Sequence, residues 1–193
     1  MQILVVGFGP FLDVADNPAA RLARAVDGLR DGALAVFGRE LPVSYARAPS
    51  LTRAWAQELD AAFTLGIGVA RGRTRPAVER IGRRRADATL ADVDGVRLAD
   101  LAPPDGGPEA PERLACADAE VVARELGVGL SEDAGAYVCN AWLYGVLRAG
   151  LRAAFLHVPP DGLAAGRLEA GLRSLARLAP TWPEPRPASS RPS

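Results

Sequence analysis

The segment Ser131-Glu-Asp-Ala-Gly-Ala-Tyr-Val-Cys-Asn-Ala-Trp-Leu-Tyr-Gly-Val-Leu-Arg-Ala-Gly150 contains a predicted strand, a cysteine and a predicted helix in immediate succession. Residues 136–138 are compatible with a buried strand, and the apolar spacing after them is that of a helix ending before Gly150. Cys139 is therefore predicted at the carboxyl end of a strand and at a helix N-terminus, where open α/β sheets bind ligands. There the helix dipole would lower the pKa of a thiol and favour the nucleophilic thiolate.

A structural role for Cys139 stays open on position alone, because free cysteines are among the most often buried residues. The next predicted strand, within residues 152–159, favours catalysis because it contains His157, the only histidine in the chain. A strand that follows a strand–helix unit usually lies parallel and adjacent to the first strand, which would bring Cys139 and His157 together. A histidine in an apolar strand is more often a core residue. Its place at the strand end, just before Pro159, instead favours a general base paired with a nucleophile.

Composition limits the classes of protein to consider. The chain has 193 residues, of which 49% are hydrophobic, and this predicts a globular domain with a sizeable core. Its 23 basic residues are all arginine and are balanced by 23 acidic residues. This balance argues against nucleic acid or an anionic membrane as the main partner. The absence of lysine excludes a Schiff-base lysine and a P-loop lysine.

The cysteines and the first residues predict the cellular compartment. Residues 1–7 have neither a basic region nor a cleavage site of a signal peptide, and no apolar run reaches membrane-spanning length. A reducing cytoplasm is therefore expected. Both Cys116 and Cys139 are predicted to be free thiols.

Apolar runs and amphipathic stretches alternate along the chain, which predicts an α/β domain with helices on both faces of a sheet. A candidate hairpin turning at Asp94-Gly95 predicts that the sheet is mixed. Residues 1–182 are expected to form one domain, and the Pro/Ser/Arg-rich residues 183–193 a disordered tail. Strands are predicted at 3–6, 34–37, 41–44, 63–67, 136–138 and 152–159, a hairpin at 89–98, and helices at 18–29, 50–62, 111–126, 139–149 and 162–178.

Two glycine-rich loops suggest nucleotide binding at first inspection. After the first strand, Leu12 stands where a dinucleotide-binding loop needs its third glycine, and Pro10 fits that turn poorly. The loop at residues 68–74 lacks P-loop spacing, and Arg73 stands where the lysine is required. Neither loop therefore supports a nucleotide or phosphate site. The later run at residues 83–85 is interpreted as a solvated face with surface ion pairs.

Several motifs together resemble pyroglutamyl peptidase type I, also called pyrrolidone carboxyl peptidase, a cysteine peptidase family. The resemblance covers roughly residues 1–160. Its two most specific motifs surround Cys139 and His157. The motifs occur in this order: Gly7-Phe-Gly-Pro-Phe11, Asn17-Pro18, Leu41-Pro-Val43, Glu79-Arg80, Asp92 with Gly95, Asp133-Ala-Gly-Ala-Tyr-Val-Cys-Asn140 and Phe155-Leu-His-Val-Pro159.

The resemblance implies a three-layer α/β/α sandwich with a twisted, mostly parallel, mixed sheet. It implies a cysteine peptidase that removes an N-terminal pyroglutamyl residue, with Glu79, Cys139 and His157 as a catalytic triad. Phe8 and Phe11 match the positions that line the pyroglutamate pocket. No metal or organic cofactor is implied, and the family is often tetrameric. The expected partner is a peptide with a blocked N-terminus, without nucleic acid or membrane.

Elementary chemistry is consistent with these implied roles. The pyroglutamyl ring is a flat, neutral lactam that two aromatic rings could hold without a buried charge. The Cys139 thiolate would attack the acyl carbon, His157 would transfer protons, and Glu79 would hold the imidazole in the required tautomer. The backbone N–H of Cys139, at the helix start, is a candidate oxyanion donor.

The sequence departs from the family at three positions. Members usually have Gln at the position of Val69, Asn at Arg84 and Arg at Thr89. Loss of the last arginine would weaken transition-state stabilisation, unless an arginine of the 83–85 run replaces it. Two hypotheses therefore remain: an active pyroglutamyl peptidase, and a diverged homologue with weak or no turnover that binds or cleaves a different blocked amide.

Overall fold

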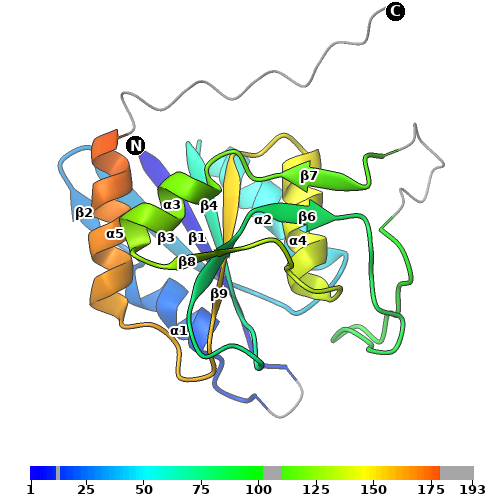
Figure 1. The fold of residues 1–193 in the computed structure, drawn as a ribbon. Helices are drawn as coiled ribbons and strands as arrows, with labels where there is room; N and C mark the ends of the chain where they lie inside the picture. Colours follow the sequence, from blue (N-terminus) through cyan, green and yellow to red (C-terminus); the bar gives the residue numbers. More distant parts are fainter. Residues whose placement is uncertain (12–13, 102–109, 179–193) are drawn as a thin grey trace, which may run out of the picture.

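The computed structural model describes residues 1–11, 14–101 and 110–178, which build a central sheet with helices on both faces (Figure 1). The strands are β1 (Gln2–Phe8), β2 (Arg30–Asp31), β3 (Leu34–Leu41), β4 (Phe63–Val69), β5 (Ala77–Glu79), β6 (Ile81–Arg83), β7 (Arg113–Ala115), β8 (Gly129–Ser131) and β9 (Ala153–Val158). The helices are α1 (Pro18–Ala25), α2 (Arg47–Glu58), α3 (Ala119–Leu126), α4 (Val138–Arg148) and α5 (Ala165–Leu178).

The main sheet has seven strands in the order β2-β3-β1-β4-β9-β5-β8. The pairs β3–β1, β1–β4, β4–β9 and β5–β8 are parallel, whereas β2–β3 and β9–β5 are antiparallel. The expected mixed, mostly parallel sheet of a three-layer sandwich is therefore confirmed. The reversal between β9 and β5 matters for function because the residues at the ends of these two strands meet there.

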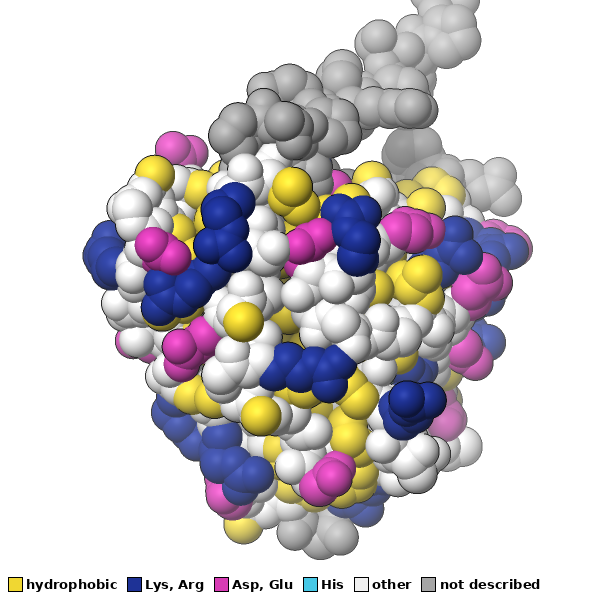
Figure 2. Space-filling model, turned by 60° about the vertical axis from the view of Figure 1, so that its left-hand side comes forward, with side chains coloured by type: hydrophobic (Ala, Val, Ile, Leu, Met, Phe, Trp, Pro, Cys, Tyr) yellow, Lys and Arg dark blue, Asp and Glu magenta, His cyan; other side chains and the backbone are white. Residues whose placement is uncertain are grey.

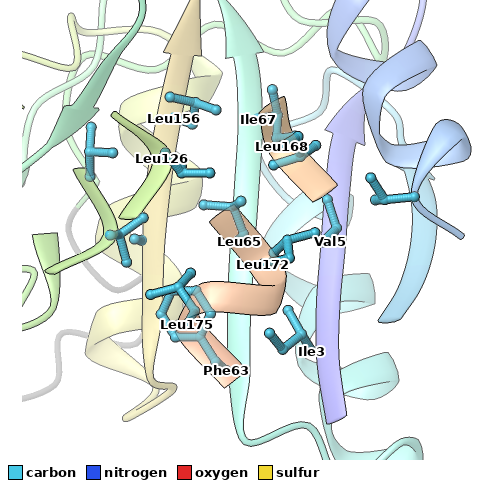
Figure 3. Close-up of a cluster of buried hydrophobic side chains, with 14 of the residues drawn as sticks. Ile3, Val5, Phe63, Leu65, Ile67, Leu126, Leu156, Leu168, Leu172 and Leu175 are labelled. Carbon is cyan, nitrogen blue, oxygen red and sulfur yellow. The ribbon is translucent and has the colours of Figure 1, made fainter. Parts of the chain in front are cut away.

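One face of the sheet is covered by α1, α3 and α5. Continuous apolar runs in β1, β4 and β9 place side chains on both faces, as expected for strands that helices cover from both sides. Leu168, Leu172 and Leu175 of α5 are fully buried on this face, as the helical spacing predicted. They pack into a cluster with side chains of β1, β4, α3 and β9 (Figure 3).

The opposite face is covered by α2 and α4. Trp142 of α4 is fully buried and lies 5.4 Å, between ring centroids, from Phe155 of β9. The Trp142 indole N–H donates to the Thr52 hydroxyl of α2 at 2.8 Å, which satisfies its one polar atom. This packing fixes α4, and hence its N-terminal residues, against β4 and β9.

Local signals fix several helix ends. The side chain of Asn17 accepts a hydrogen bond from the Ala19 N–H, and Pro18 occupies the first turn of α1, as predicted. Gly127 ends α3 with a φ of 64°, a left-handed conformation that glycine adopts without strain. The glycine at position 150, with a φ of 78°, follows α4 in the same way.

Three local predictions are wrong. Residues 89–98 form turns instead of a hairpin, because Asp92 accepts hydrogen bonds from the N–H groups of Asp94 and Val96 and closes a compact loop. Residues 34–37 and 41–44 are not two strands, since β3 runs unbroken to Leu41 beside β1. The helix expected from residue 111 begins only at Ala119, because β7 pairs with β6 first.

The face of the molecule displayed in Figure 2 carries basic and acidic side chains interspersed with apolar ones. Within the described residues, every helix is too short or too polar to cross a membrane. The predicted tail at residues 183–193 lies outside the described residues.

Candidate active site

His157 and Glu79 meet across the antiparallel pair β9–β5. In this register His157 lies opposite Ala77 and Glu79 opposite Phe155, so the two polar side chains are diagonal neighbours on one face. His157 Nδ1 lies 2.7 Å from Glu79 Oε1. The exposed fraction is 0% for Glu79 and 5% for His157, so solvent hardly competes for this contact. The sequence therefore predicted this carboxylate–imidazole pair correctly.

Glu79 also has a cationic neighbour that the sequence did not predict. Arg73 Nη2, from the loop between β4 and β5, lies 2.6 Å from the same Oε1. Burial alone would raise the pKa of Glu79, but the hydrogen bond and charge of His157 and the charge of Arg73 hold this pKa below its ordinary value. Glu79 is consequently a carboxylate at neutral pH. Its other oxygen, Oε2, accepts no hydrogen bond in the described part of the chain.

An ionised Glu79 assigns the tautomer of His157. The carboxylate can only accept a hydrogen bond, so Nδ1 carries the proton of the neutral ring. Nε2 then has the free lone pair and can take a proton from a neighbouring group. The ring is also packed edge-on against Phe155, with ring centroids 5.0 Å apart. The imidazole is thus held in a fixed orientation, with Nε2 able to accept a proton.

Cys139 is the second residue of α4, and the strand expected at residues 136–138 is absent. Residues 132–137 form a bend instead, in which Gly135 has a φ of 80°, and the buried Val138 begins the helix. The adjacency predicted for the strands before and after α4 is also wrong, because β5 lies between β8 and β9. Cys139 approaches His157 because α4 packs over β4 and β9, not because two parallel strands end side by side.

The thiol of Cys139 lies directly over Gly68 of β4. A Cβ atom built on Gly68 would be 2.8 Å from Cys139 Sγ, and Gly68 is the residue that pairs with His157 across β4–β9. The thiol and the imidazole therefore occupy neighbouring positions on one sheet face. No hydrogen bond joins them among the described residues, and catalytic contacts are often looser in substrate-free structures than in the reacting complex.

The Cys139 thiol is not activated by its helix position alone. Burial, with a smaller effect of the Glu79 carboxylate, raises its pKa to about 12, although its own backbone N–H acts in the opposite direction. The expected lowering of this pKa is therefore wrong for the substrate-free molecule. The neutral thiol must lose its proton to a base, which is the role that the free Nε2 of His157 can fill.

A cavity of about 80 Å³ opens beside the thiol. Both predicted pocket residues, Phe8 and Phe11, line it. The ring of Tyr137, the residue before the helix, lies 5.2 Å from that of Phe11 between centroids. The cavity wall is mostly apolar and is formed by Phe8, Phe11, Val14, Asn17, Val43, Val69, Arg71, Tyr137 and Cys139.

The residue after the cysteine fixes the arginine run at residues 83–85. Asn140 is fully buried, and its side-chain oxygen accepts from the Arg83 N–H at 2.9 Å. Its amide donates to the carbonyl oxygens of Arg83 and Arg85 at 2.8 and 2.9 Å. The main chain of this run is thus part of the site's scaffold, whereas its side chains form the surface contacts that were predicted: Arg83 donates to the Glu132 carbonyl, Arg84 approaches Asp100, and Arg85 pairs with Asp133.

The other cysteine, Cys116, is buried and donates to the Ala153 carbonyl at 3.1 Å. Burial raises the pKa of its thiol to about 12, although the backbone N–H of the residue at position 118 acts in the opposite direction. Both cysteines are free thiols, as predicted. In the described ranges no group of three or more His, Cys, Asp or Glu side chains is arranged to hold a metal ion.

The sequence alone did not indicate Arg73, Tyr137 or Asn140 as site residues. Arg73 was considered only as a failed P-loop lysine, and its contact depends on the position of β5 in the sheet. Tyr137 and Asn140 flank Cys139 directly, so their place beside a nucleophile was the available signal. A cysteine, a histidine and a carboxylate on one face of an α/β/α sheet define a candidate thiol-hydrolase site.

Comparison with known proteins agrees with this class. The sequence profile of the pyroglutamyl peptidase family matches residues 1–176. A pyrrolidone-carboxylate peptidase of Cupriavidus pinatubonensis is 32% identical over 191 residues, covering 91% of this chain and 88% of the relative. One of Pyrococcus furiosus is 32% identical over 168 residues, covering 82% and 81%.

Solved structures show the same fold. The pyrrolidone carboxyl peptidase of Thermococcus litoralis superposes with a TM-score of 0.81 at 23% identity, covering 98% of this chain and 99% of that one. A mutant pyrrolidone carboxyl peptidase of Pyrococcus furiosus gives 0.78 at 26% identity, covering 94% and 99%. The chain belongs to the pyroglutamyl peptidase family, which is a family of peptidases and hence of hydrolases.

Proposed function

We propose that this protein is a cysteine peptidase that removes an N-terminal pyroglutamyl residue from peptides, with Glu79, Cys139 and His157 as its triad. The observation that carries the proposal is the buried Glu79–His157 contact of 2.7 Å beside the thiol that lies over Gly68. The names of the relatives supply the substrate class. The free thiols fit action in a reducing cytoplasm, on peptides whose N-terminus is blocked.

Acylation begins with proton transfer from Cys139 Sγ to His157 Nε2. The thiolate then attacks the pyroglutamyl carbonyl carbon, and the carbonyl oxygen becomes an oxyanion. The backbone N–H of Cys139, in the first turn of α4, is a donor available to that oxyanion. As the tetrahedral intermediate collapses, the C–N bond breaks and the departing amine takes the proton from His157. The products are a thioester and the shortened peptide.

Deacylation repeats the same steps with water. His157 takes a proton from water, the hydroxide attacks the thioester carbon, and the oxyanion collapses to release pyroglutamate and the thiolate, which regains its proton. Glu79 supports both halves because its negative charge stabilises the imidazolium formed in each. The proposed steps use these side chains, a backbone N–H and water.

The cavity beside the thiol suits a small, neutral ring. Its mostly apolar lining, with aromatic rings from Phe8, Phe11 and Tyr137, offers flat contact area, and among the described residues it holds no carboxylate to bind a free ammonium. An unblocked N-terminal amine would lose its hydration there without a partner. The pocket chemistry therefore favours a lactam over a charged N-terminal residue.

A second candidate function is a homologue with weak or no pyroglutamyl turnover that acts on a different blocked amide. It is favoured by Thr89, which stands where the family usually has Arg. Its hydroxyl is hydrogen-bonded to Asp87 at 2.6 Å and is exposed. Val69, where the family usually has Gln, lines the cavity and makes the pocket more apolar.

The test is hydrolysis of a pyroglutamyl-linked fluorogenic amide by the wild type, Cys139→Ala and Cys116→Ser. We expect turnover by the wild type and Cys116→Ser, and none by Cys139→Ala. Equal rates for the wild type and Cys139→Ala would exclude Cys139 as the nucleophile. A folded wild type without turnover, but with Cys139 alkylated by a reactive blocked-amide analogue, would favour the second candidate.

A further inference from the structure

Arg73 joins three elements of the site through one nitrogen atom. Its Nη2 lies 2.6 Å from Glu79 Oε1, 2.8 Å from the hydroxyl of Ser131 in β8 and 3.0 Å from the carbonyl oxygen of Asp133. The side chain is 24% exposed, against 0% for Glu79. The Arg73 side chain is therefore partly exposed to solvent, whereas the carboxylate that it contacts is fully buried.

Arg73 and His157 converge on the same carboxylate oxygen. His157 Nδ1 lies 2.7 Å from Glu79 Oε1, while Glu79 Oε2 accepts no hydrogen bond among the described residues. Rotation of the carboxylate by a quarter turn would break both contacts at once. Arg73 thus holds Oε1 toward the imidazole even when the ring is neutral and its hydrogen bond is weaker.

The charges around Glu79 show why a second cation matters. With His157 neutral, Glu79 would be an isolated buried anion if Arg73 were absent, and a buried anion without a partner is costly. The other groups that face Glu79 are the Ser131 hydroxyl from β8 and the thiol of Cys139 from α4, neither of which carries a permanent charge. Beyond Ser131, the carboxylate of Asp133 is paired with Arg85. Within the described residues, Arg73 is therefore the permanent cation that contacts this carboxylate.

We infer that Arg73 is a positioning residue of the catalytic triad: it keeps Glu79 ionised with Oε1 on His157 Nδ1, and so sets the pH range in which Cys139 reacts. This inference rests on the proposed triad. The Arg73 guanidinium contacts Glu79, Ser131 and Asp133, so it acts on the imidazole and the thiol through Glu79. The alternative is that Arg73 only ties the loop before β5 to β8, in which case its loss would lower stability without moving the pH dependence.

The experiment compares Arg73→Met, Arg73→Gln and Arg73→Lys, all in a Cys116→Ser background so that Cys139 is the only thiol. The rate of alkylation by iodoacetamide is measured from pH 5 to pH 10, below the raised pKa of Cys139, and requires no pyroglutamyl turnover. The alkylation midpoint of each variant is defined as the pH at which its rate reaches one hundredth of the wild-type rate at pH 10. The acid limb of kcat/KM for a pyroglutamyl amide and the melting temperature are measured alongside. Arg75→Met is the matched control, since Arg75 is an exposed arginine of the same loop.

Removing the positive charge disfavours both the Glu79 carboxylate and the Cys139 thiolate. We expect the alkylation midpoint and the acid limb to move up by about one pH unit in Arg73→Met and Arg73→Gln. Arg73→Lys, which keeps a cation with three donors, and Arg75→Met should stay close to the wild type. Arg73→Gln retains hydrogen-bonding capacity, so it serves if Arg73→Met does not fold.

A folded Arg73→Gln whose midpoint matches that of the wild type would overturn the inference, whatever its melting temperature. A midpoint that moves equally in Arg73→Lys would also overturn it, because the charge would then not be the cause. If the wild type does not turn over pyroglutamyl amides but the alkylation midpoints move as expected, the inference about Arg73 stands and only the proposed substrate fails.

Discussion

Cys139 Sγ lies so close to Gly68 that a Cβ atom on the glycine would be 2.8 Å from the sulfur. The two residues are far apart in the sequence and come together because α4 packs onto β4. The same added Cβ would be 2.8 Å from the ring of Phe155, whose packing supports His157. The site of the nucleophile thus depends on the absence of a side chain at position 68.

Gly68→Ala should therefore impair catalysis more than stability. The methyl group must push Sγ or the Phe155 ring, and misplacing a reacting group by about 1 Å costs about 100-fold in rate. The measurement is kcat for a pyroglutamyl amide, together with the melting temperature. Gly72→Ala is the matched control, because a Cβ there meets no atom within 4 Å. Wild-type kcat in a folded Gly68→Ala would contradict this view of the site.

Asn140→Ala should destabilise the protein by about 1–3 kcal/mol. The substitution leaves the main-chain groups of Arg83 and Arg85 without their side-chain partner, in a place where Asn140 itself is fully buried. Urea denaturation measures the loss. Asn140→Asp keeps the acceptor for the Arg83 N–H and loses both donors, so it separates the two ends of the amide. An unchanged unfolding midpoint in Asn140→Ala would show that water replaces these bonds at no cost.

Much of the fold could be predicted from the sequence because its signals are local. The apolar runs of β1, β4 and β9, the Asn17 cap and the glycine after α3 each depend on a few neighbouring residues. The alternation of strands and helices then leaves few arrangements other than a sheet covered on both faces. These signals do not specify strand order, so the position of β5 between β8 and β9 was not foreseen.

The approach of Glu79 to His157 could be predicted from the motifs, but the electrostatics of the candidate site only in part. Motifs placed Glu79, Cys139 and His157 together, whereas the charge state of the thiol depends on burial and on Glu79, which act through space. Arg73 was missed for the same reason, since its partner is set by the strand order. Residues 136–138 looked like a strand because they are apolar, but apolar residues at a helix start, where Val138 is buried, give the same pattern.

The loss of folding stability at acid pH should depend on Glu79. Its pKa is lower in the folded protein than its ordinary value of 4.5, so the folded state binds fewer protons than the unfolded state as the pH falls. The stabilisation is fully present above that ordinary value and is lost as the pH drops through the lowered pKa. Glu79→Gln, although less stable at neutral pH, should lose less stability between pH 6 and pH 3. Parallel loss in both proteins, measured by urea denaturation, would assign the acid sensitivity to other carboxylates.

Position 89 gives a test of transition-state stabilisation. Thr89 is exposed on a turn that lies against the residues just before Cys139, since the Asp87 N–H donates to the Ala136 carbonyl and the Tyr137 hydroxyl donates to the Ala91 carbonyl. A long cationic side chain starting from this turn could reach the cavity that Cys139 lines. Thr89→Arg should therefore add a donor for the oxyanion, and the loss of one such donor typically costs 100- to 1000-fold in rate.

We expect Thr89→Arg to raise kcat by about tenfold or more while changing KM less, because the new contact would be stronger in the transition state than in the ground state. Thr89→Met, a long and uncharged side chain, is the control for added bulk. Arg84 is already held by Asp100 and the Ala110 carbonyl, so we expect it to compete little for the space of the new arginine. The double variant Thr89→Arg with Arg84→Asn tests whether the charge of Arg84 repels the arginine introduced at position 89. Arg97 already donates to the Thr89 carbonyl, so its guanidinium lies at the same turn. If neither the single nor the double variant gains activity while both stay folded, the oxyanion explanation fails, and the changed pocket then indicates a different blocked amide as the substrate.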